Sequence, residues 1–241
     1  MDPDSFPRRE EDDDVPVDPT MYQLLSGSVN FLVTGTRMDL AFPTAFMSTF
    51  NAKPMEGHLS MAKDVLRSVK HTLDYRLFYP REVSPAMLDI YSDASYNTNP
   101  DNSKAFGVWI QLLNGSPVAW SSKRQSTVAK STYEAEYMAC PSASSHLRWM
   151  IQTIRDLSAV HVDRLPVLHV DNQPALDLVR NAKITARSKH IAVHYHFVRE
   201  GVGTIYDVEH VSSADTLADI CTKVLPKPVL LGLCRSLGLL H

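Results

Sequence analysis

Apolar positions recur at helical spacing through the first third of the chain. Residues 20–80 carry two such runs, at 24–33 and 59–69, whose apolar residues fall three or four apart. The first run contains Leu24, Leu25, Val29, Leu32 and Val33, and the second contains Leu59, Ala62, Val65, Leu66 and Val69. Pro54 shortly precedes the second run, near the expected start of a helix. The pattern predicts a small helical segment over 20–82, with a short strand at 73–79.

From residue 86 to residue 225 the pattern changes to short apolar runs separated by turns and helical stretches. Strands are predicted at 88–95, 106–113, 117–122, 167–171 and 204–211. Helices are predicted at 131–157, 173–181, 189–200 and 214–223, and a helical tail at 226–241. Asn114-Gly115 is a two-residue hairpin signal, and Pro141 is expected to kink or break the first of these helices. The order of elements indicates an α/β fold with a mixed five-stranded sheet flanked by helices.

Charge is distributed unevenly along the chain. The net charge is −3, but residues 1–20 hold eight of the 27 acidic and two of the 24 basic residues, so the remainder carries +3. The segment 1–19 is therefore predicted to be a solvated, disordered acidic tail. The weakly basic body, with a domain expected over 86–225, is compatible with phosphate contacts.

Composition narrows the class of protein further. No apolar run approaches the roughly 18 residues that a membrane span needs, and the acidic N-terminus lacks the apolar core of a secretion signal. The cysteines Cys140, Cys221 and Cys234 are odd in number and lack metal-ligand spacing, which is typical of reduced thiols. We expect a protein of the cytoplasm or nucleus that is neither secreted nor bound to a membrane.

Four acidic residues stand where a sheet and its helices can bring them together. Asp93 lies in the predicted strand 88–95, and Asp171 ends the strand that starts at residue 167. Glu136 lies in the long predicted helix, and Asp219 lies in the last helix of the domain. Magnesium prefers carboxylate oxygens, and two ions about 3.5–4 Å apart can activate a water and stabilise a leaving oxygen in phosphodiester hydrolysis. The pattern favours a nuclease that uses two Mg²⁺ ions, with Mn²⁺ as an expected substitute.

Two neighbouring acids compete for these positions. Glu134 lies two residues from Glu136 and is expected to point from another face of the helix into solvent. Asp215 precedes Asp219 at the expected helix start, where a capping role is natural. Taken singly, each acid is weak evidence, because an aspartate at a strand end is usually a turn or cap residue.

Six motifs in order resemble the ribonuclease H domain of copia-type long-terminal-repeat retrotransposon Pol polyproteins. They are Tyr-Ser-Asp-Ala-Ser at 91–95, Val-Ala-Trp-Ser-Ser-Lys-Arg-Gln at 118–125, Glu-Ala-Glu-Tyr-Met-Ala at 134–139, Val-Asp-Asn-Gln at 170–173, Arg-Ser-Lys-His-Ile-Ala-Val-His-Tyr-His-Phe-Val-Arg-Glu at 187–200 and Leu-Ala-Asp-Ile-Cys-Thr-Lys at 217–223. Residues 22–28 and 73–79 are similar to the segment that links reverse transcriptase to ribonuclease H in those polyproteins. The resemblance covers nearly everything except the acidic tail.

The resemblance implies a ribonuclease-H-like fold and cleavage of the RNA strand in RNA–DNA hybrids, leaving a 3′-hydroxyl and a 5′-phosphate. The acidic positions of the family fall on Asp93, Glu136, Asp171 and Asp219. A reverse transcriptase domain is a second partner that it implies. No Tyr-x-Asp-Asp polymerase motif occurs, so no reverse transcriptase activity is expected. Departures such as Pro141 keep an alternative open, in which a decayed copy acts only as a nucleic-acid-binding or structural module.

Further residues are candidates for secondary roles. By resemblance, His210 aids proton or product handling, although it is equally a histidine at a strand end. Ser95, Asn172 and Gln173 are candidates for contacts to sugar or phosphate, and the latter two alternatively cap the next helix.

A basic stretch follows these candidates in the sequence. It includes Arg187, Lys189 and His190, and we predict that it tracks the phosphates of the hybrid, the alternative being a solvated helix face. His190 and His194 are spaced as zinc ligands can be, but no third ligand cluster accompanies them, so we reject a zinc site.

Overall fold

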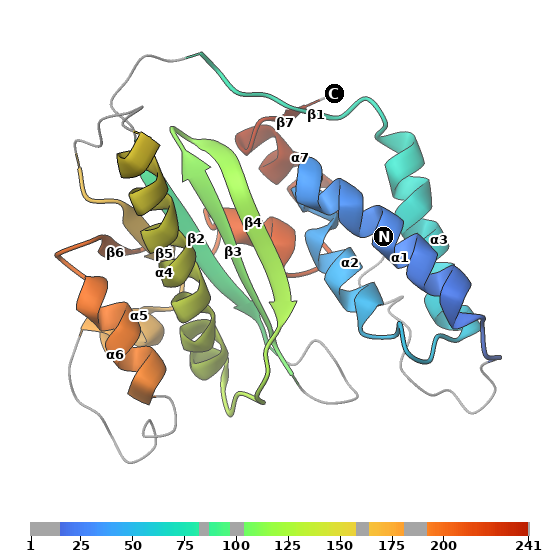
Figure 1. The fold of residues 1–241 in the computed structure, drawn as a ribbon, viewed down its shortest axis with the longest axis horizontal. Coiled ribbons are helices and arrows are strands. Elements are labelled where there is room, and N and C mark those ends of the chain that lie inside the picture. Colours follow the sequence, from blue (N-terminus) through green and yellow to red (C-terminus); the bar gives the residue numbers. More distant parts are fainter. Residues whose placement is uncertain (1–14, 82–86, 97–103, 158–163, 181–191, 241) are drawn as a thin grey trace.

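The computed structural model describes residues 15–81, 87–96, 104–157, 164–180 and 192–240 of the chain, and its centre is a five-stranded sheet (Figure 1). The strands of this sheet are β2 (Leu88–Ser95), β3 (Phe106–Leu113), β4 (Ser116–Arg124), β5 (Val167–Val170) and β6 (Asp207–His210). The α-helices are α1 (Pro19–Gly35), α2 (Ala41–Ser48), α3 (Glu56–His71), α4 (Thr132–Leu157), α5 (Gln173–Arg180), α6 (Ala192–Gly201) and α7 (Lys227–Ser236). Two short 3-10 helices, η2 (Met38–Leu40) and η4 (Leu217–Cys221), and a small sheet of β1 (Arg76–Leu77) and β7 (Leu239–Leu240) complete the described elements.

The central sheet is mixed and has the strand order β4-β3-β2-β5-β6. The pairs β2–β3 and β3–β4 are antiparallel, whereas β2–β5 and β5–β6 are parallel. Asn114 and Gly115 join β3 to β4 with φ angles of 50° and 76°, which is the left-handed backbone that a tight hairpin of this kind requires. The predicted α/β class with a mixed five-stranded sheet is therefore confirmed.

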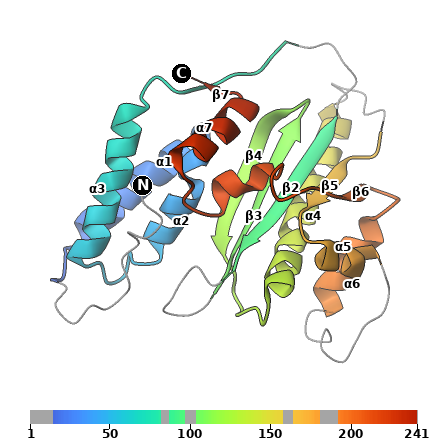
Figure 2. The ribbon, with the colours of Figure 1, turned by 180° about the vertical axis from the view of Figure 1, so that it is seen from behind.

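Helices cover the sheet on both faces (Figures 1 and 2). On one face, Leu88 and Ile90 of β2 are fully buried in a cluster with Cys140 and Leu147 of α4. On the other face, the even-numbered residues of β3 pack in a second cluster with residues of the N-terminal helices, η4 and α7. The alternation of side chains along a strand explains why β3 contributes to both clusters.

The first predicted helix forms as α1, but it buries only part of the predicted apolar run, since Leu24 is 71% exposed. Asp18 accepts a hydrogen bond from the Thr20 N–H at 3.0 Å, and Pro19 occupies the first turn of α1, where its missing N–H has no cost. Tyr22, Val29 and Val33 form the buried stripe of this helix. The separation of the chain into a segment 20–82 and a domain 86–225 remains a prediction, because the cluster on the β3 face draws residues from both.

Pro141 does not break α4, because the helix runs without interruption from Thr132 to Leu157, so the predicted division into two pieces is wrong. A proline in a helix interior costs about 3 kcal/mol. The fully buried Cys140, Ala143 and Leu147 stand on both sides of it. Burial of large apolar side chains contributes roughly 1.5–3 kcal/mol each, so packing against the sheet outweighs the local penalty.

Other elements are shorter than predicted. The strand expected at 73–79 is only Arg76–Leu77, and the strand expected at 204–211 is Asp207–His210. The helix expected at 214–223 is the 3-10 helix η4, which ends as the Thr222 N–H and hydroxyl both donate to the carbonyl of Asp219. Within the described ranges, no helix has the length and apolar character needed to cross a bilayer.

Candidate metal centre

Two neighbouring parallel strands place Asp93 beside Asp171. Ser92 of β2 pairs with Val170 of β5, so the residue that follows each of them lies at the same level of the sheet. β5 ends at Val170, which puts Asp171 at the carboxyl end of its strand, where sites in sheets of this kind commonly form. The Asp93 carboxylate accepts a hydrogen bond from the Ala94 N–H at 2.7 Å. Strand pairing alone therefore brings two of the four predicted acids together.

Helix α4 brings the third acid. Glu136 precedes Cys140, Ala143 and Leu147 on the stripe of α4 that faces the sheet, at the spacing of four, seven and eleven residues that a helix needs. The apolar members of this stripe are fully buried, and Glu136 is itself only 5% exposed. Packing of the stripe thus fixes the carboxylate at the end of the sheet where Asp93 lies.

The three carboxylates converge. One oxygen each from Asp93, Glu136 and Asp171 lies within 4.8 Å of the others. Asp93 and Glu136 are buried and Asp171 is partly buried. Oε2 of Glu136 is buried without a hydrogen-bond partner among the described residues. A set of hard oxygen donors with one orphaned carboxylate oxygen fits a magnesium ion.

The raised pKa values of the three acids also favour a metal site. Burial and the charge of Asp171 raise the pKa of Asp93 to about 6. Burial, and next the charge of Asp93, strongly raise the pKa of Glu136. Partial burial raises the pKa of Asp171, while a hydrogen bond from Ser213 opposes the shift. The three neighbouring acids are hard to ionise together. A divalent cation bound among them would stabilise their charged carboxylate forms.

Asp219 lies next to the cluster without joining it. Its charge contributes to the raised pKa of both Asp93 and Asp171, so it is close to each. Its own carboxylate is paired with the Lys223 ammonium at 2.8 Å, one helical turn away. The structure therefore brings three of the four predicted acids into one group and places the fourth beside it in an ion pair.

Glu134 is not solvated, contrary to the prediction. It is 5% exposed, and its carboxylate accepts a hydrogen bond from the Lys130 N–H at 3.0 Å, while its own N–H donates to the Ser131 hydroxyl at 3.4 Å. These bonds close the start of α4 in the manner of a capping box. Glu134 is thus a helix-start residue, and this role distinguishes it from Glu136. Asp215 likewise accepts from the Ser212 hydroxyl at 2.5 Å in the preceding turn.

Comparison with known proteins adds an independent line of evidence. The chain is 34% identical over 222 residues to the retrovirus-related Pol polyprotein from transposon RE1 of Arabidopsis thaliana. It is 32% identical over 221 residues to that from transposon TNT 1-94 of Nicotiana tabacum. The chain belongs to the copia-type Pol polyprotein family. These matches span 92% and 91% of the chain but only 15% and 16% of the relatives, so the chain corresponds to a small part of their length. No family model matches.

Among solved structures, the Pol polyprotein segment is similar to LC11 ribonuclease H1, isolated from compost. The identity is 13%, and the match covers 56% of the segment and 92% of that enzyme with a TM-score of 0.44. The same enzyme in complex with an RNA/DNA hybrid shares 16% identity over 56% of the segment and 93% of the enzyme, with a TM-score of 0.40. What the structure itself shows is a mixed α/β sheet in the order β4-β3-β2-β5-β6, with α4 lying across one of its faces.

The secondary candidates surround Asp171 in the segment. His210 is exposed, and its Nε2 lies 3.2 Å from the Asp171 carbonyl oxygen. The Ser213 hydroxyl donates to the Asp171 carboxylate at 3.2 Å, a contact that sequence reasoning missed although Ser213 lies in the loop that follows His210. Asn172 accepts from the Ala175 N–H at 3.0 Å, so it caps α5. The capping alternative is therefore realised for Asn172, and its nucleic-acid contact remains a prediction.

The structure says less about the other residues that were predicted to bind nucleic acid. Gln173 is exposed and donates to the Asp177 carboxylate one turn along α5. Ser95 is partly buried at the end of β2. Arg187, Lys189 and His190 lie outside the described residues, as does the side chain of His194. The predicted phosphate contacts of this stretch remain predictions.

Proposed function

We propose that this segment hydrolyses the RNA strand of RNA–DNA hybrids by a two-magnesium mechanism. The observation that carries the proposal is the convergence of Asp93, Glu136 and Asp171 within 4.8 Å. Chance clusters of acids are usually exposed, whereas two of these are buried and one has an orphaned oxygen. Membership of the copia-type Pol family supports the same chemistry, and the activity and partners of the whole polyprotein are likewise proposals for this segment.

Each acid has a distinct part in the proposal. Asp93 is the central metal ligand, because its carboxyl interacts with both Glu136 and Asp171. Asp171 is the second ligand. Glu136 offers its orphaned oxygen to a metal ion. Asp219 completes the ligand set by releasing the Lys223 ammonium and binding a metal ion instead. When bound, the two ions supply an activated water and a stabilised leaving oxygen. His210, which is exposed and lies 3.2 Å from the Asp171 carbonyl oxygen, is proposed to pass protons to solvent.

The hybrid is proposed to lie over the end of the sheet that carries the acids. Ser95, Asn172 and Gln173 stand at this end and are proposed to contact sugar or phosphate, where 2′-hydroxyls distinguish the RNA strand. A reverse transcriptase domain is a proposed partner, since the relatives are whole Pol polyproteins. The absence of a Tyr-x-Asp-Asp motif leaves no basis for polymerase activity in this segment.

The decisive experiment incubates the full chain with a hybrid labelled on its RNA strand, with magnesium, manganese or a chelator. The matched variants are Glu136→Gln and Glu134→Gln, because both residues are 5% exposed and lie on the same helix. We expect Glu136→Gln and Asp93→Asn to lower cleavage by about 10³-fold or more, since each removes a metal ligand. Glu134→Gln is expected to retain cleavage. Hybrid binding without metal-dependent loss of RNA in the unaltered chain would instead identify a non-catalytic binding module.

The proposed phosphate contacts have their own test. Lys189→Ala is expected to weaken hybrid binding equally for all sequences and to reduce the salt slope of the affinity by about one, because one phosphate contact is lost. Lys63→Ala, at an exposed position on α3, serves as the control. Titrations of each variant with the hybrid at several salt concentrations measure the affinity and its salt slope. An unchanged affinity and slope in Lys189→Ala would show that the stretch is only a solvated face.

A further inference from the structure

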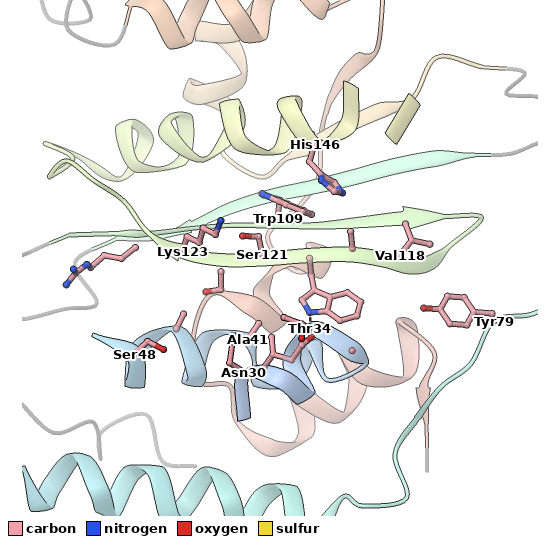
Figure 3. A pocket seen from close by; sticks show the side chains of 17 residues that line it. Asn30, Thr34, Ala41, Ser48, Tyr79, Trp109, Val118, Ser121, Lys123 and His146 are labelled. Atoms are coloured by element: carbon pink, nitrogen blue, oxygen red, sulfur yellow. Dashed lines mark hydrogen bonds between the residues drawn. The ribbon is translucent and has the colours of Figure 1, made fainter. Parts of the chain in front are cut away.

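A groove with a volume of about 770 Å³ follows the outer edge of β4, two strands away from the strand that carries Asp93. Figure 3 shows its walls: Trp109 and His146 lie on one side of β4, and Asn30, Thr34 and Ala41 lie on the other. The first wall comes from β3 and α4, and the second from α1 and α2. The edge strand therefore forms the floor between two helical layers.

The edge itself is available for pairing. β4 is the outermost strand, so alternate backbone N–H and C=O groups point away from β3 into the groove. No hydrogen bond from another described residue reaches the outward groups of 118–123. The nearest one is at Pro117, whose carbonyl accepts from the Tyr79 hydroxyl at 2.9 Å. Such a row of backbone groups is a template for one added strand.

The groove also offers polar and charged groups to an occupant. Oγ of Ser122 and Nε2 of His146 are buried without a partner among the described residues, and both residues line the groove. Lys123 and Arg124 are exposed at one end, and neither forms an ion pair with a described residue. A segment that presents hydrogen-bonding groups along its length and negative charge at one end would match this surface.

We propose that the β4 groove binds an extended polypeptide segment that pairs with the edge of β4 and carries acidic side chains against Lys123 and Arg124. Small or β-branched apolar side chains suit the groove, because Val33 of α1 and Val118 of β4 contribute to its apolar lining. The proposal is independent of the ribonuclease activity, since it uses none of the clustered acids.

Two other occupants fit the groove less well. A second copy of the folded chain would bring a whole sheet to this edge, which is flanked by Trp109 and His146 on one side and by Asn30 and Thr34 on the other. A single-stranded nucleic acid would meet Lys123 and Arg124 favourably, but its phosphates are acceptors only. They cannot pair with the carbonyl groups that alternate with the N–H groups along β4.

The test uses the full chain and fluorescein-labelled peptides of about ten residues with alternating threonine and valine. Two peptides, with a pair of aspartates at the N-terminus or at the C-terminus, represent the antiparallel and parallel directions. A third carries N-methyl groups on alternate amides, which removes backbone pairing while keeping the side chains. Fluorescence anisotropy gives the affinities, and amide hydrogen exchange reports protection of residues 118–123.

We expect one aspartate peptide to bind and to slow exchange at 118–123, and its N-methylated form to bind about tenfold more weakly or worse. The double variant Lys123→Glu/Arg124→Glu should weaken binding about fivefold or more, whereas Lys63→Glu/Lys70→Glu on α3 should not. Equal affinity for the N-methylated peptide, or no binding near 1 mM peptide, overturns the proposal. So does a single-stranded oligonucleotide that binds and protects 118–123 where the peptides do not.

Discussion

At the scale of single residues, Glu134 and Glu136 show how position decides the role of one side chain. Both are equally buried on α4, yet Glu134 accepts from a backbone N–H at the helix start, and Glu136 has an orphaned oxygen beside Asp93. The sequence could distinguish them by helical spacing, because only Glu136 continues the stripe of Cys140 and Leu147. It could not show that Glu134 is buried, because the Lys130 contact depends on the path of the chain before α4.

The raised carboxyl pKa values predict a dependence of stability on pH in the absence of divalent ions. The pKa of Asp93 is raised to about 6 and that of Glu136 is raised as well. A carboxyl with a higher pKa in the folded state binds its proton more tightly there, so its contribution is complete below the unfolded pKa of about 4 and is lost as pH rises through the folded pKa. In a chelator, we therefore expect the melting temperature to fall relative to Asp93→Asn between about pH 4 and pH 6.

Magnesium should restore the melting temperature of the unaltered chain at the upper end of this range, since the cation binds the ionised folded site and not the unfolded chain. Asp93→Asn should respond less, because it lacks the central carboxylate. Scanning calorimetry across pH, with and without magnesium, measures both effects. Parallel pH profiles for the two proteins in chelator would show that Asp93 carries no unfavourable charge in the folded state.

At the scale of elements, α4 is the helix that tertiary packing most clearly sustains. Pro141 interrupts its hydrogen-bond ladder, since it lacks the N–H that would donate to the carbonyl of Tyr137. Pro141→Ala restores this donor without altering the buried stripe, so we expect the free energy of unfolding to rise by about 1–3 kcal/mol. Cleavage of the hybrid should be unchanged. Urea unfolding with the cleavage assay tests both, and a lower stability would mean that the packing of α4 requires the proline ring.

The elements divide into those that local sequence specifies and those that packing specifies. The β3–β4 hairpin was predictable because Asn114-Gly115 has a strong preference for its backbone geometry. The continuity of α4 was not predictable, because the apolar face that outweighs Pro141 exists only against the sheet. The helix predicted at 214–223 is the short η4, whose end is set by Thr222 bonding back to Asp219. The acids of the cluster were found because each sits on an element whose type was correctly predicted.

At the scale of the whole molecule, the N-terminal helices and the sheet share one buried cluster. Phe42 of α2, 1% exposed, meets Phe106 of β3 edge to face, with ring centroids 5.4 Å apart. The same cluster contains Val108, Ile110 and Leu112 of β3. At roughly 2 kcal/mol for each buried side chain, this face of β3 contributes on the order of 8 kcal/mol, comparable with the net stability of a typical domain. The sheet therefore depends on helices that carry none of the clustered acids.

The N-terminal helices and the sheet should therefore unfold together, and Phe42→Ala tests this. We expect it to lower the free energy of unfolding by about 3–5 kcal/mol, because it leaves a cavity against Phe106. Phe31→Ala, on α1, is the control, because Phe31 is 78% exposed and its loss should change stability by less than about 0.5 kcal/mol. Tryptophan fluorescence reports the sheet and α4 through Trp109 and Trp149, and the contact with α1 through Trp120, whose indole donates to the Val33 carbonyl at 2.9 Å. Circular dichroism reports all helices. Coincident transitions shifted equally by Phe42→Ala indicate one cooperative unit. A fluorescence transition that the substitution leaves in place would show that the sheet is stable without the N-terminal helices, so that the acidic cluster would persist in a chain that lacks them.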